Sequence, residues 1–239
     1  KIAPQHLFTI VNGDIQYLDL IVEYGSDWDL LGVNAYRGVS FTDLWPRVKD
    51  ELNLPIVFFE FGSDAFNARD FREDQAAQAN YLRMQWQEMY AKSYGNGAEG
   101  NSIGGFVFEW RDEWWKYKQT ENLDVQDTNA SWANGGYKFD HVEGQNNMNE
   151  EWFGITRIGK LDNDGVYVSE PRTAYDVLAS IWALDPYQAQ GTVLSSQIRD
   201  MNMDYFNLKS EVRALKSAQE KSQKFQMTGG SIKGEMIIN

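Results

Sequence analysis

Acidic side chains that directly follow short apolar runs are the residues of this sequence with the clearest chemical potential. Glu60 comes after five residues that are apolar or proline, and Gly62 lies two positions further on. A carboxylate at the end of a buried strand is rarely only structural, because its lost hydration must be compensated. It can act as a nucleophile where hydrogen-bond donors and a water-poor pocket keep it ionised. Glu60 is therefore the leading catalytic candidate, and the alternatives are a buried ion pair or a carboxylate kept by an inactive protein.

The charge and the aromatic content of the chain narrow the class of ligand. A net charge of −13 disfavours nucleic acid as a partner, because phosphate binding requires a basic surface. Anionic membranes are disfavoured for the same reason, whereas a neutral polymer is not repelled. Aromatic residues make up 14% of the chain, and such rings stack on pyranose faces while carboxylates accept hydrogen bonds from sugar hydroxyls. The composition therefore suits sugar recognition, although many of these rings could equally belong to an ordinary core.

Four apolar runs alternate with segments of helical periodicity in the acidic part of the chain. The runs are 7–11, 30–33, 56–59 and 105–108, and the helical segments are 15–24, 41–52, 74–94 and 173–183. Continuous apolarity predicts strands that are covered on both faces, as in a parallel sheet. Alternation of strands with helices predicts βαβ units, and an Asp-Gly turn within 161–166 predicts a hairpin before the last helix.

The polar residues after each run decide between two α/β architectures. They lie at 12–14, 34–36, 60–62 and 109–113. In a closed barrel, all four segments open onto the carboxyl-terminal face, where active sites lie. A separate four-stranded sheet would leave two unpaired edges and one bare face. We therefore predict an α/β fold that is the C-terminal half of a (β/α)8 TIM barrel, strands five to eight, and not a small doubly wound sheet.

The same motifs resemble the TIM-barrel retaining glycoside hydrolases of clan A, which include families two and five and the β-1,3-glucanosyltransferases. Residues 55–62, Pro-Ile-Val-Phe-Phe-Glu-Phe-Gly, are similar to strand seven of these enzymes, where the Glu is the nucleophile. Residues 31–36 are similar to strand six, 104–110 to strand eight with its sugar-stacking Trp, and 171–178 to the closing helix. The resemblance covers roughly residues 5–185 and implies that Glu60 is the nucleophile.

A second carboxyl group is needed for retaining chemistry, about 5 Å from the first. In the resembling enzymes, this acid/base Glu follows an Asn at the end of strand four, which would lie upstream of Lys1. Asn149-Glu150 occurs only in the long loop after the fourth run, the wrong place for that role. The resemblance therefore implies that the N-terminal half of the barrel is a partner of this chain and carries the acid/base residue.

The expected substrate-binding residues follow from the resemblance and from their place after the strands. They are Asn34, Tyr36, Glu109, Trp110, Glu113, Trp114 and Trp115. Tyr36 could also donate a hydrogen bond to Glu60 from the neighbouring strand. The acids at 109, 112 and 113 could instead pair with Arg111, Lys116 and Lys118.

The loop over residues 119–153 is expected to line one side of the sugar-binding cleft. Its candidate aromatic platforms for sugar stacking are Trp132, Tyr137 and Trp152. No cofactor and no metal are expected, because two carboxylates suffice for the reaction. A calcium site at Asp124, Asp127 and Asp140 is a weak alternative, since these residues lack the spacing of a calcium-binding loop.

The composition changes after residue 187, which predicts a domain edge between residues 1–187 and 188–239. All nine Trp precede this point, and residues 188–239 carry seven Lys or Arg against five Asp or Glu. Apolar residues at alternating spacings of three and four predict a helix over about 194–226, namely Ile198, Met201, Tyr205, Leu208, Val212 and Leu215. This helix is either a coiled-coil strand with a partner or an amphipathic helix on its own domain. Residues 236–238 look like the start of a further element.

These observations together predict a retaining glycoside hydrolase or transglycosidase that acts on a β-glucan-like polysaccharide or oligosaccharide. Because polysaccharides are mostly processed outside the cytoplasm, we expect it to be secreted, periplasmic or at the cell surface. The alternative is a noncatalytic carbohydrate-binding or scaffold barrel in a cell-surface or polysaccharide-synthesis assembly. A weaker third option is a small α/β binding protein that is complete as shown.

Overall fold

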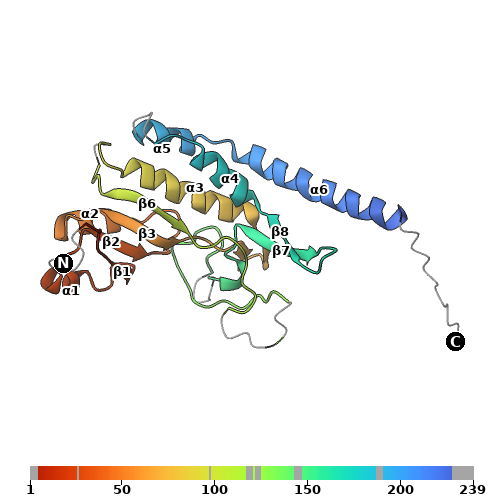
Figure 1. The fold of residues 1–239 in the computed structure, drawn as a ribbon, viewed down its shortest axis with the longest axis horizontal. Helices are drawn as coiled ribbons and strands as arrows, with labels where there is room; N and C mark the ends of the chain where they lie inside the picture. Colours follow the sequence, from red (N-terminus) through yellow and green to blue (C-terminus); the bar gives the residue numbers. More distant parts are fainter. Residues whose placement is uncertain are drawn as a thin grey trace.

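The central element is a parallel sheet of four strands, seen in a computed structural model of the chain (Figure 1). The structure describes residues 5–25, 27–96, 98–116, 121, 125–142, 147–186 and 191–227, without the side chains of 191, 192 and 221–227. The strand order is β1-β2-β3-β6, with the strands at Thr9–Gly13, Leu30–Asn34, Ile56–Phe61 and Ser102–Val107. All three pairings are parallel, so the predicted α/β class with a parallel sheet is confirmed. The closed barrel to which such a sheet would belong stays a prediction.

Helices connect the strands where the sequence predicted them, with shorter ends. They are α1 (Leu18–Tyr24), α2 (Leu44–Glu51), α3 (Gln75–Ala91) and α4 (Thr173–Trp182). Asp74 fixes the start of α3, because its side chain accepts a hydrogen bond from the backbone N–H of Ala77. The predicted hairpin is confirmed as β7 (Thr156–Leu161) and β8 (Tyr167–Pro171). Smaller elements are β4 (Phe66–Asn67), β5 (Arg72–Glu73) and the 3-10 turn η1 (Glu150–Trp152).

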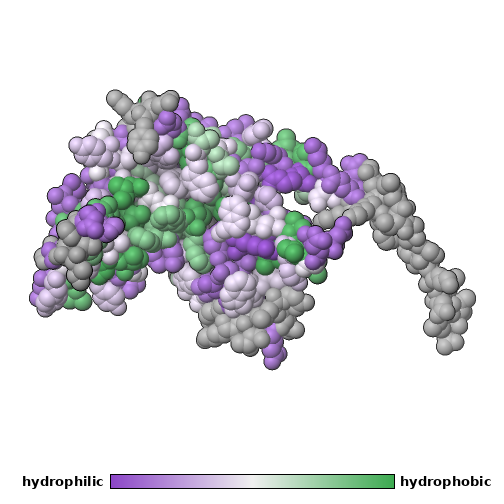
Figure 2. Space-filling model, in the orientation of Figure 1, coloured by the Kyte–Doolittle hydropathy of each residue, from purple (hydrophilic) through white to green (hydrophobic). Residues whose placement is uncertain are grey.

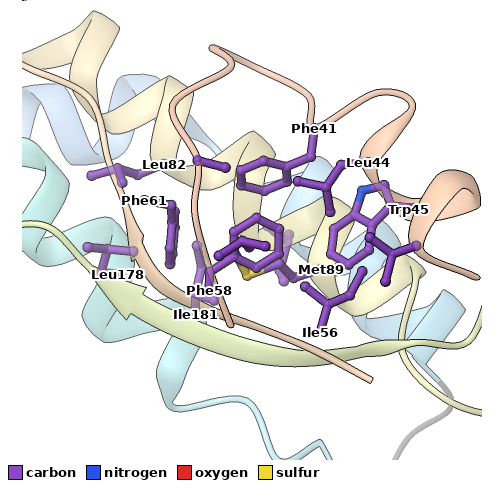
Figure 3. Packing of buried hydrophobic residues seen from close by; sticks show 14 of the residues in the cluster. Phe41, Leu44, Trp45, Ile56, Phe58, Phe61, Leu82, Met89, Leu178 and Ile181 are labelled. Carbon is purple, nitrogen blue, oxygen red and sulfur yellow. The ribbon is translucent and has the colours of Figure 1, made fainter. Parts of the chain in front are cut away.

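One face of the sheet packs against helices and forms the core. Phe58 and Phe61 of β3 point into this layer with Phe41 and Trp45, and their rings lie at contact distances with centroids 4.1 to 6.2 Å apart. Aliphatic residues of α3 and α4 complete the packing, as Figure 3 shows for Leu82, Met89, Leu178 and Ile181. This burial stabilises the sheet on that side and fixes the positions of its carboxyl ends.

The opposite face of the sheet is largely uncovered by the described residues. Val11 of β1 is 45% exposed and Phe106 of β6 is 63% exposed, and the Phe59 ring lies beside Phe106 with a centroid distance of 6.1 Å. Gly32 permits this arrangement, because a β-carbon there would lie 2.7 Å from the Phe59 ring. Figure 2 shows hydrophobic residues gathered where Figure 1 draws the sheet. The expectation that both faces are covered is therefore met on one face only.

The predicted helix over 194–226 is wrong as a single element. The structure has two helices, α5 (Gly191–Arg199) and α6 (Met203–Met227). The break has a local cause: Asn202 accepts a hydrogen bond from the backbone N–H of Tyr205 at 3.3 Å, as a residue that caps a helix start does. α5 packs against α3, and Ile198 and Phe206 join the core cluster. Among the described helices, none is long and apolar enough to cross a membrane.

A buried ion pair joins the segment after β6 to the start of α4. Arg172 is fully buried and donates to both carboxylate oxygens of Asp112, at 2.6 and 2.8 Å. It also donates to Glu73 at 2.8 Å and to the carbonyl of Gly154 at 2.6 Å. The sequence analysis offered Arg111 and Lys116 as alternative partners of Asp112, but its partner is Arg172. Both carboxylate oxygens of Asp112 are engaged by Arg172 and are therefore not available for sugar hydroxyls.

Loss of Arg172 should destabilise the fold severely. We expect Arg172→Met to lower the free energy of unfolding by about 3–5 kcal/mol, because Asp112 would keep a buried charge without its partner. Equilibrium unfolding in urea measures this change. Arg199→Met is the matched control, because the Arg199–Asp200 pair is exposed and its loss should leave stability nearly unchanged. Equal effects of the two substitutions would contradict the role given to the buried pair.

Candidate active site

Glu60 and Tyr36 meet at the carboxyl ends of two adjacent parallel strands. The Tyr36 hydroxyl donates to a carboxylate oxygen of Glu60 at 3.1 Å. Asn34, which ends β2, is the register partner of Glu60, and one residue separates it from Tyr36. The expected contact between Tyr36 and Glu60 is therefore present. It leaves the second carboxylate oxygen of Glu60 free of this hydrogen bond.

Aromatic rings surround Tyr36 and make its surroundings poor in water. Its ring packs edge-on against Phe153, Phe108 and Trp132, with centroids 5.5, 6.5 and 6.2 Å away. Burial, together with the negative charge of Glu60, raises the pKa of Tyr36 far above its ordinary value. The hydroxyl therefore keeps its proton and remains a hydrogen-bond donor at physiological pH.

The long loop after β6 is anchored directly over Tyr36. The Asn134 side chain donates to the backbone carbonyl of Tyr36. Gly38, with a φ of +79°, lies so close to Gly136 that a β-carbon would meet the Gly136 carbonyl oxygen at 1.9 Å. This close approach brings Trp132 onto Tyr36, so Trp132 is the one predicted platform that borders the Tyr36–Glu60 pair.

The other two predicted platforms lie elsewhere. Tyr137 is fully buried and donates to the carbonyl of Gly62 at 2.8 Å, so its prediction as a surface for sugar stacking is wrong. Trp152 donates to the carbonyl of Asp127 at 2.7 Å and packs on Phe66. Both rings support the loop from within. No sequence pattern indicates this role, because aromatic residues occur in cores and on binding surfaces alike.

Glu109 and Glu113 form an acidic pair in the segment after β6. Burial, followed by the charge of Glu113, raises the pKa of Glu109 to about 9. Glu113 is paired with Lys116 at 2.9 Å, and the Lys116 ammonium lies 5.3 Å from the centre of the Phe108 ring. The charge of Glu109 also contributes to the raised pKa of Tyr36. Glu109 is therefore a neutral carboxylic acid near pH 7 and can donate a hydrogen bond.

A cleft of about 690 Å³ lies between the segment after β6 and the β7–β8 hairpin. Glu109, Trp110, Glu113, Trp114 and Trp115 all line it, together with Tyr167 from the hairpin. The Trp110 ring packs on Tyr175 of α4, and Trp114 packs on Tyr167. Glu60 and Tyr36 do not line this cleft. The predicted binding residues thus form two groups, one around Glu60 and one in the cleft, and Glu109 belongs to both.

Some polar atoms of the predicted binding residues have no partner among the residues that the structure describes. One carboxylate oxygen of Glu109, the side-chain oxygen of Asn34 and the indole N–H of Trp114 are buried in this way. Buried polar groups are normally hydrogen-bonded, so each of these atoms is available to a ligand or to a further part of the protein.

The charge of Glu150 acts on Tyr36 from the long loop after β6. Its position in the long loop made it look remote, yet its charge contributes to the raised pKa of Tyr36 and acts on Lys116. Glu150 accepts a hydrogen bond from Ser131 at 2.7 Å, while its neighbour Asn149 is buried and donates its backbone N–H to Asp64. The loop closure at Gly38 and Gly136, which no local pattern reveals, brings this carboxylate to the site.

The described residues contain no group of three or more His, Asp or Glu that could hold a metal ion. The weak calcium alternative depends on Asp124, which lies outside the described residues. Asp127 accepts from the backbone of Asn129, and Asp140 is buried.

The pKa of Glu109 predicts how stability depends on pH. In the unfolded chain Glu109 loses its proton near its ordinary pKa of 4.5, and in the folded chain its pKa is about 9. Between these two pH values the folded state binds more protons than the unfolded state. The free energy of unfolding therefore falls as the pH rises from about 4.5 to about 9. Glu109→Gln removes the effect. We expect the variant to match the wild type near about pH 5 and to exceed it in stability near about pH 8.5 in urea unfolding.

The matched control for this comparison is Glu51→Gln, which removes an exposed carboxylate on α2 that pairs with Arg47. It reports the general effect of removing one negative charge from an acidic protein. An advantage of Glu109→Gln that is constant between the two pH values, or equal to that of Glu51→Gln, would contradict a neutral Glu109.

Comparisons with known proteins give distant structural likenesses only. No protein-family model and no curated protein matches the chain. Its fold is similar to the β-glucuronidase of Ruminococcus gnavus, at a TM-score of 0.35 and 16% identity, over 81% of this chain and 26% of that one. It is also similar to a β-glucosidase from Exiguobacterium marinum, at a TM-score of 0.32 and 14% identity, over 78% of this chain and 41% of that one. The chain spans less than half of either structure, and these likenesses assign no family.

Proposed function

We propose that this chain carries the nucleophile of a retaining glycoside hydrolase or transglycosidase that acts on a β-glucan-like polysaccharide. The single observation that supports this most is the hydrogen bond between Tyr36 and Glu60 at the ends of adjacent parallel strands. The resemblance of residues 55–62 to strand seven of the clan A enzymes gives Glu60 the same role. As a site of action we propose the secreted, periplasmic or cell-surface space, where such polymers occur.

In the proposed reaction, the free oxygen of Glu60 attacks the anomeric carbon and forms a covalent glycosyl ester. The bond from that carbon to the leaving oxygen breaks, and the leaving oxygen takes a proton from the acid/base carboxyl group. Water or an acceptor hydroxyl then attacks the same carbon, gives its proton to that group and releases Glu60. Tyr36 holds the other oxygen of Glu60 and so sets the direction from which the carboxylate attacks.

The binding residues have separate proposed roles around this reaction. Neutral Glu109 donates a hydrogen bond to a sugar oxygen, and Asn34 offers its unpaired side-chain oxygen to a sugar hydroxyl. Trp132, which stacks on Phe153, borders the sugar at Glu60. Trp110, Glu113, Trp114 and Trp115 bind further along the polymer, in the cleft against the hairpin.

The uncovered face of the sheet supports a further part of this proposal, namely that the N-terminal half of the barrel is a partner of this chain. Four additional βα units would pair with the edges of β1 and β6 and cover Val11, Phe59 and Phe106. A barrel interior is filled with such side chains, and the Glu60 end of the sheet would then open onto a shared active-site face. The acid/base carboxyl group is proposed to lie on that half.

Glu60→Gln should reduce kcat on β-glucan oligosaccharides at least about 1,000-fold in the protein that contains both halves of the barrel, while sugar binding and the fold persist.

Tyr36→Phe should reduce kcat roughly ten- to hundredfold, because it removes one hydrogen bond to a charged group. Hydrolysis assays, sugar binding and circular dichroism measure these outcomes.

Glu51→Gln, on the exposed face of α2, serves as the unaffected control. Retained hydrolysis in Glu60→Gln would remove Glu60 from the nucleophile role. A wild type that binds the polymer without any turnover would instead favour the noncatalytic carbohydrate-binding barrel.

A substitution on the sheet face tests the proposed partner half separately. In the protein with both halves, Phe106→Ala should lower the free energy of unfolding by about 3 kcal/mol, because the ring would be buried in the barrel interior. Tyr94→Ala, at a position 92% exposed in the loop after α3, should have little effect. A cost for Phe106→Ala no larger than that for Tyr94→Ala would show that the face remains open.

A further inference from the structure

Helix α6 presents two different faces, one toward the protein and one away from it. Phe206 is buried, and Ser210, Arg213 and Ser217 are partly buried along the same side of the helix. Ser210 donates to Gln75, and Arg213 donates to the carbonyl of Pro171 at 3.1 Å. These contacts fix the rotation of α6 against the start of α3 and the hairpin (Figure 1).

The opposite side of α6 carries an apolar stripe without cover from the described residues. Tyr205, Leu208, Val212 and Leu215 are 58%, 59%, 40% and 68% exposed. Their spacing of three, four and three places them on one side of the helix, and in heptad notation they occupy positions a, d, a and d. The buried and partly buried residues named above occupy positions b and f of the same heptads, and Lys209, which pairs with Asp176, is at position e. The stripe therefore lies on the side of the helix away from Phe206 and Arg213.

The residue types on the stripe favour a particular pairing. Val212 at position a and Leu208 and Leu215 at position d are the choice that favours two parallel strands in a coiled coil. Gln219 follows at the next a position, so the apolar stripe ends at Leu215.

The charges beside the stripe are complementary to a second copy of the same helix. In a parallel pair in register, a residue at position g faces the residue five positions later in the partner, at position e. Glu211 is at g and Lys216 at e, so each copy offers both members of a pair with the other. Asp204 and Lys209 have the same relation one heptad earlier. Glu211 and Lys216 make no ion pair within the described residues, while Lys209 lies 2.9 Å from Asp176.

From this geometry we propose that the outer face of α6 binds a second copy of this chain as a parallel, in-register two-helix coiled coil. The proposal is independent of the function proposed above, because it rests on a different surface. It combines the two alternatives that the sequence left open, a coiled-coil strand and an amphipathic helix on its own domain. α6 lies on its own protein through positions b and f and pairs with its copy through positions a and d.

Charge exchange in the full chain tests the pairing. Sedimentation equilibrium over a range of concentrations should show a dimer for the wild type and loss of that dimer for Glu211→Lys and for Lys216→Glu. Each single variant places like charges opposite one another in both copies. The double variant Glu211→Lys/Lys216→Glu restores opposite charges and should recover the dimer. A monomeric wild type, or a dimer unaffected by either single exchange, would overturn the proposal.

A matched pair of substitutions separates the stripe from a general effect of charge on α6. Leu215→Glu should abolish the dimer, whereas Ala214→Glu, at the neighbouring position c, should leave it intact. Both positions are exposed, so circular dichroism should show an unchanged helix content in each variant. Loss of the dimer in both variants would mean that the stripe is not the contact.

The orientation can be tested by crosslinking, because the chain contains no cysteine. In a parallel, in-register pair, position 215 of one copy faces position 215 of the other. Leu215→Cys should therefore form a disulfide-linked dimer when a mild thiol oxidant removes two electrons and two protons, and Ala214→Cys should not. Failure of Leu215→Cys to crosslink in a chain that is dimeric would overturn the parallel arrangement.

Discussion

The buried pair of Arg172 and Asp112 is the interaction on which the placement of the site depends. Arg172 starts α4, and Asp112 belongs to the segment that carries Glu109 and Glu113, so one guanidinium fixes that segment to the helical layer. Asp112 also accepts from the backbone N–H of Gly154, which leads into β7. A charged group shielded from water is tolerable only when it is paired and hydrogen-bonded, and Arg172 makes four hydrogen bonds, to Asp112, Glu73 and Gly154. The acidic pair of Glu109 and Glu113 and the cleft along the hairpin both depend on this anchor.

A second constraint is the unequal covering of the two sheet faces. Phe58 and Phe61 of β3 are buried against helices, whereas Phe59 of the same strand and Phe106 of β6 are exposed. This asymmetry leaves apolar residues exposed on the sheet while the Tyr36–Glu60 pair stands at its carboxyl edge. A site that must exclude water from a nucleophile therefore needs a further wall on this side. The same requirement explains why the partner half of a barrel is part of the proposed function.

The sequence predicted the features that depend on local pattern. The positions of the four parallel strands and the hairpin followed from apolar runs and an Asp-Gly turn, and the contact of Tyr36 with Glu60 followed from adjacent strands in register. The partnership of Arg172 with Asp112 was missed, because the two are 60 residues apart and nearer cations competed for the same acid. The reason for Gly62 was also missed: the carbonyl oxygen of Phe108 lies 2.0 Å from where a β-carbon would stand at this position.

Features that depend on how the long loop closes could not be predicted from local sequence patterns. The burial of Tyr137 and the approach of Glu150 to the site both follow from where residues 134–136 contact the segment after β2. The break between α5 and α6 did have a signal, the helix-capping Asn202, which the regular spacing of apolar residues concealed.

The central claim is that Glu60 forms a covalent bond to sugar, and trapping that bond tests it most directly. The protein that contains both halves would be incubated with an activated glycoside whose glycosyl ester hydrolyses slowly, then digested and analysed by mass spectrometry. The account predicts one added glycosyl mass on the peptide that includes residues 55–62 and none in Glu60→Gln. A glycosyl adduct on any other residue, or continued hydrolysis of normal substrate by Glu60→Gln without an adduct, would contradict it.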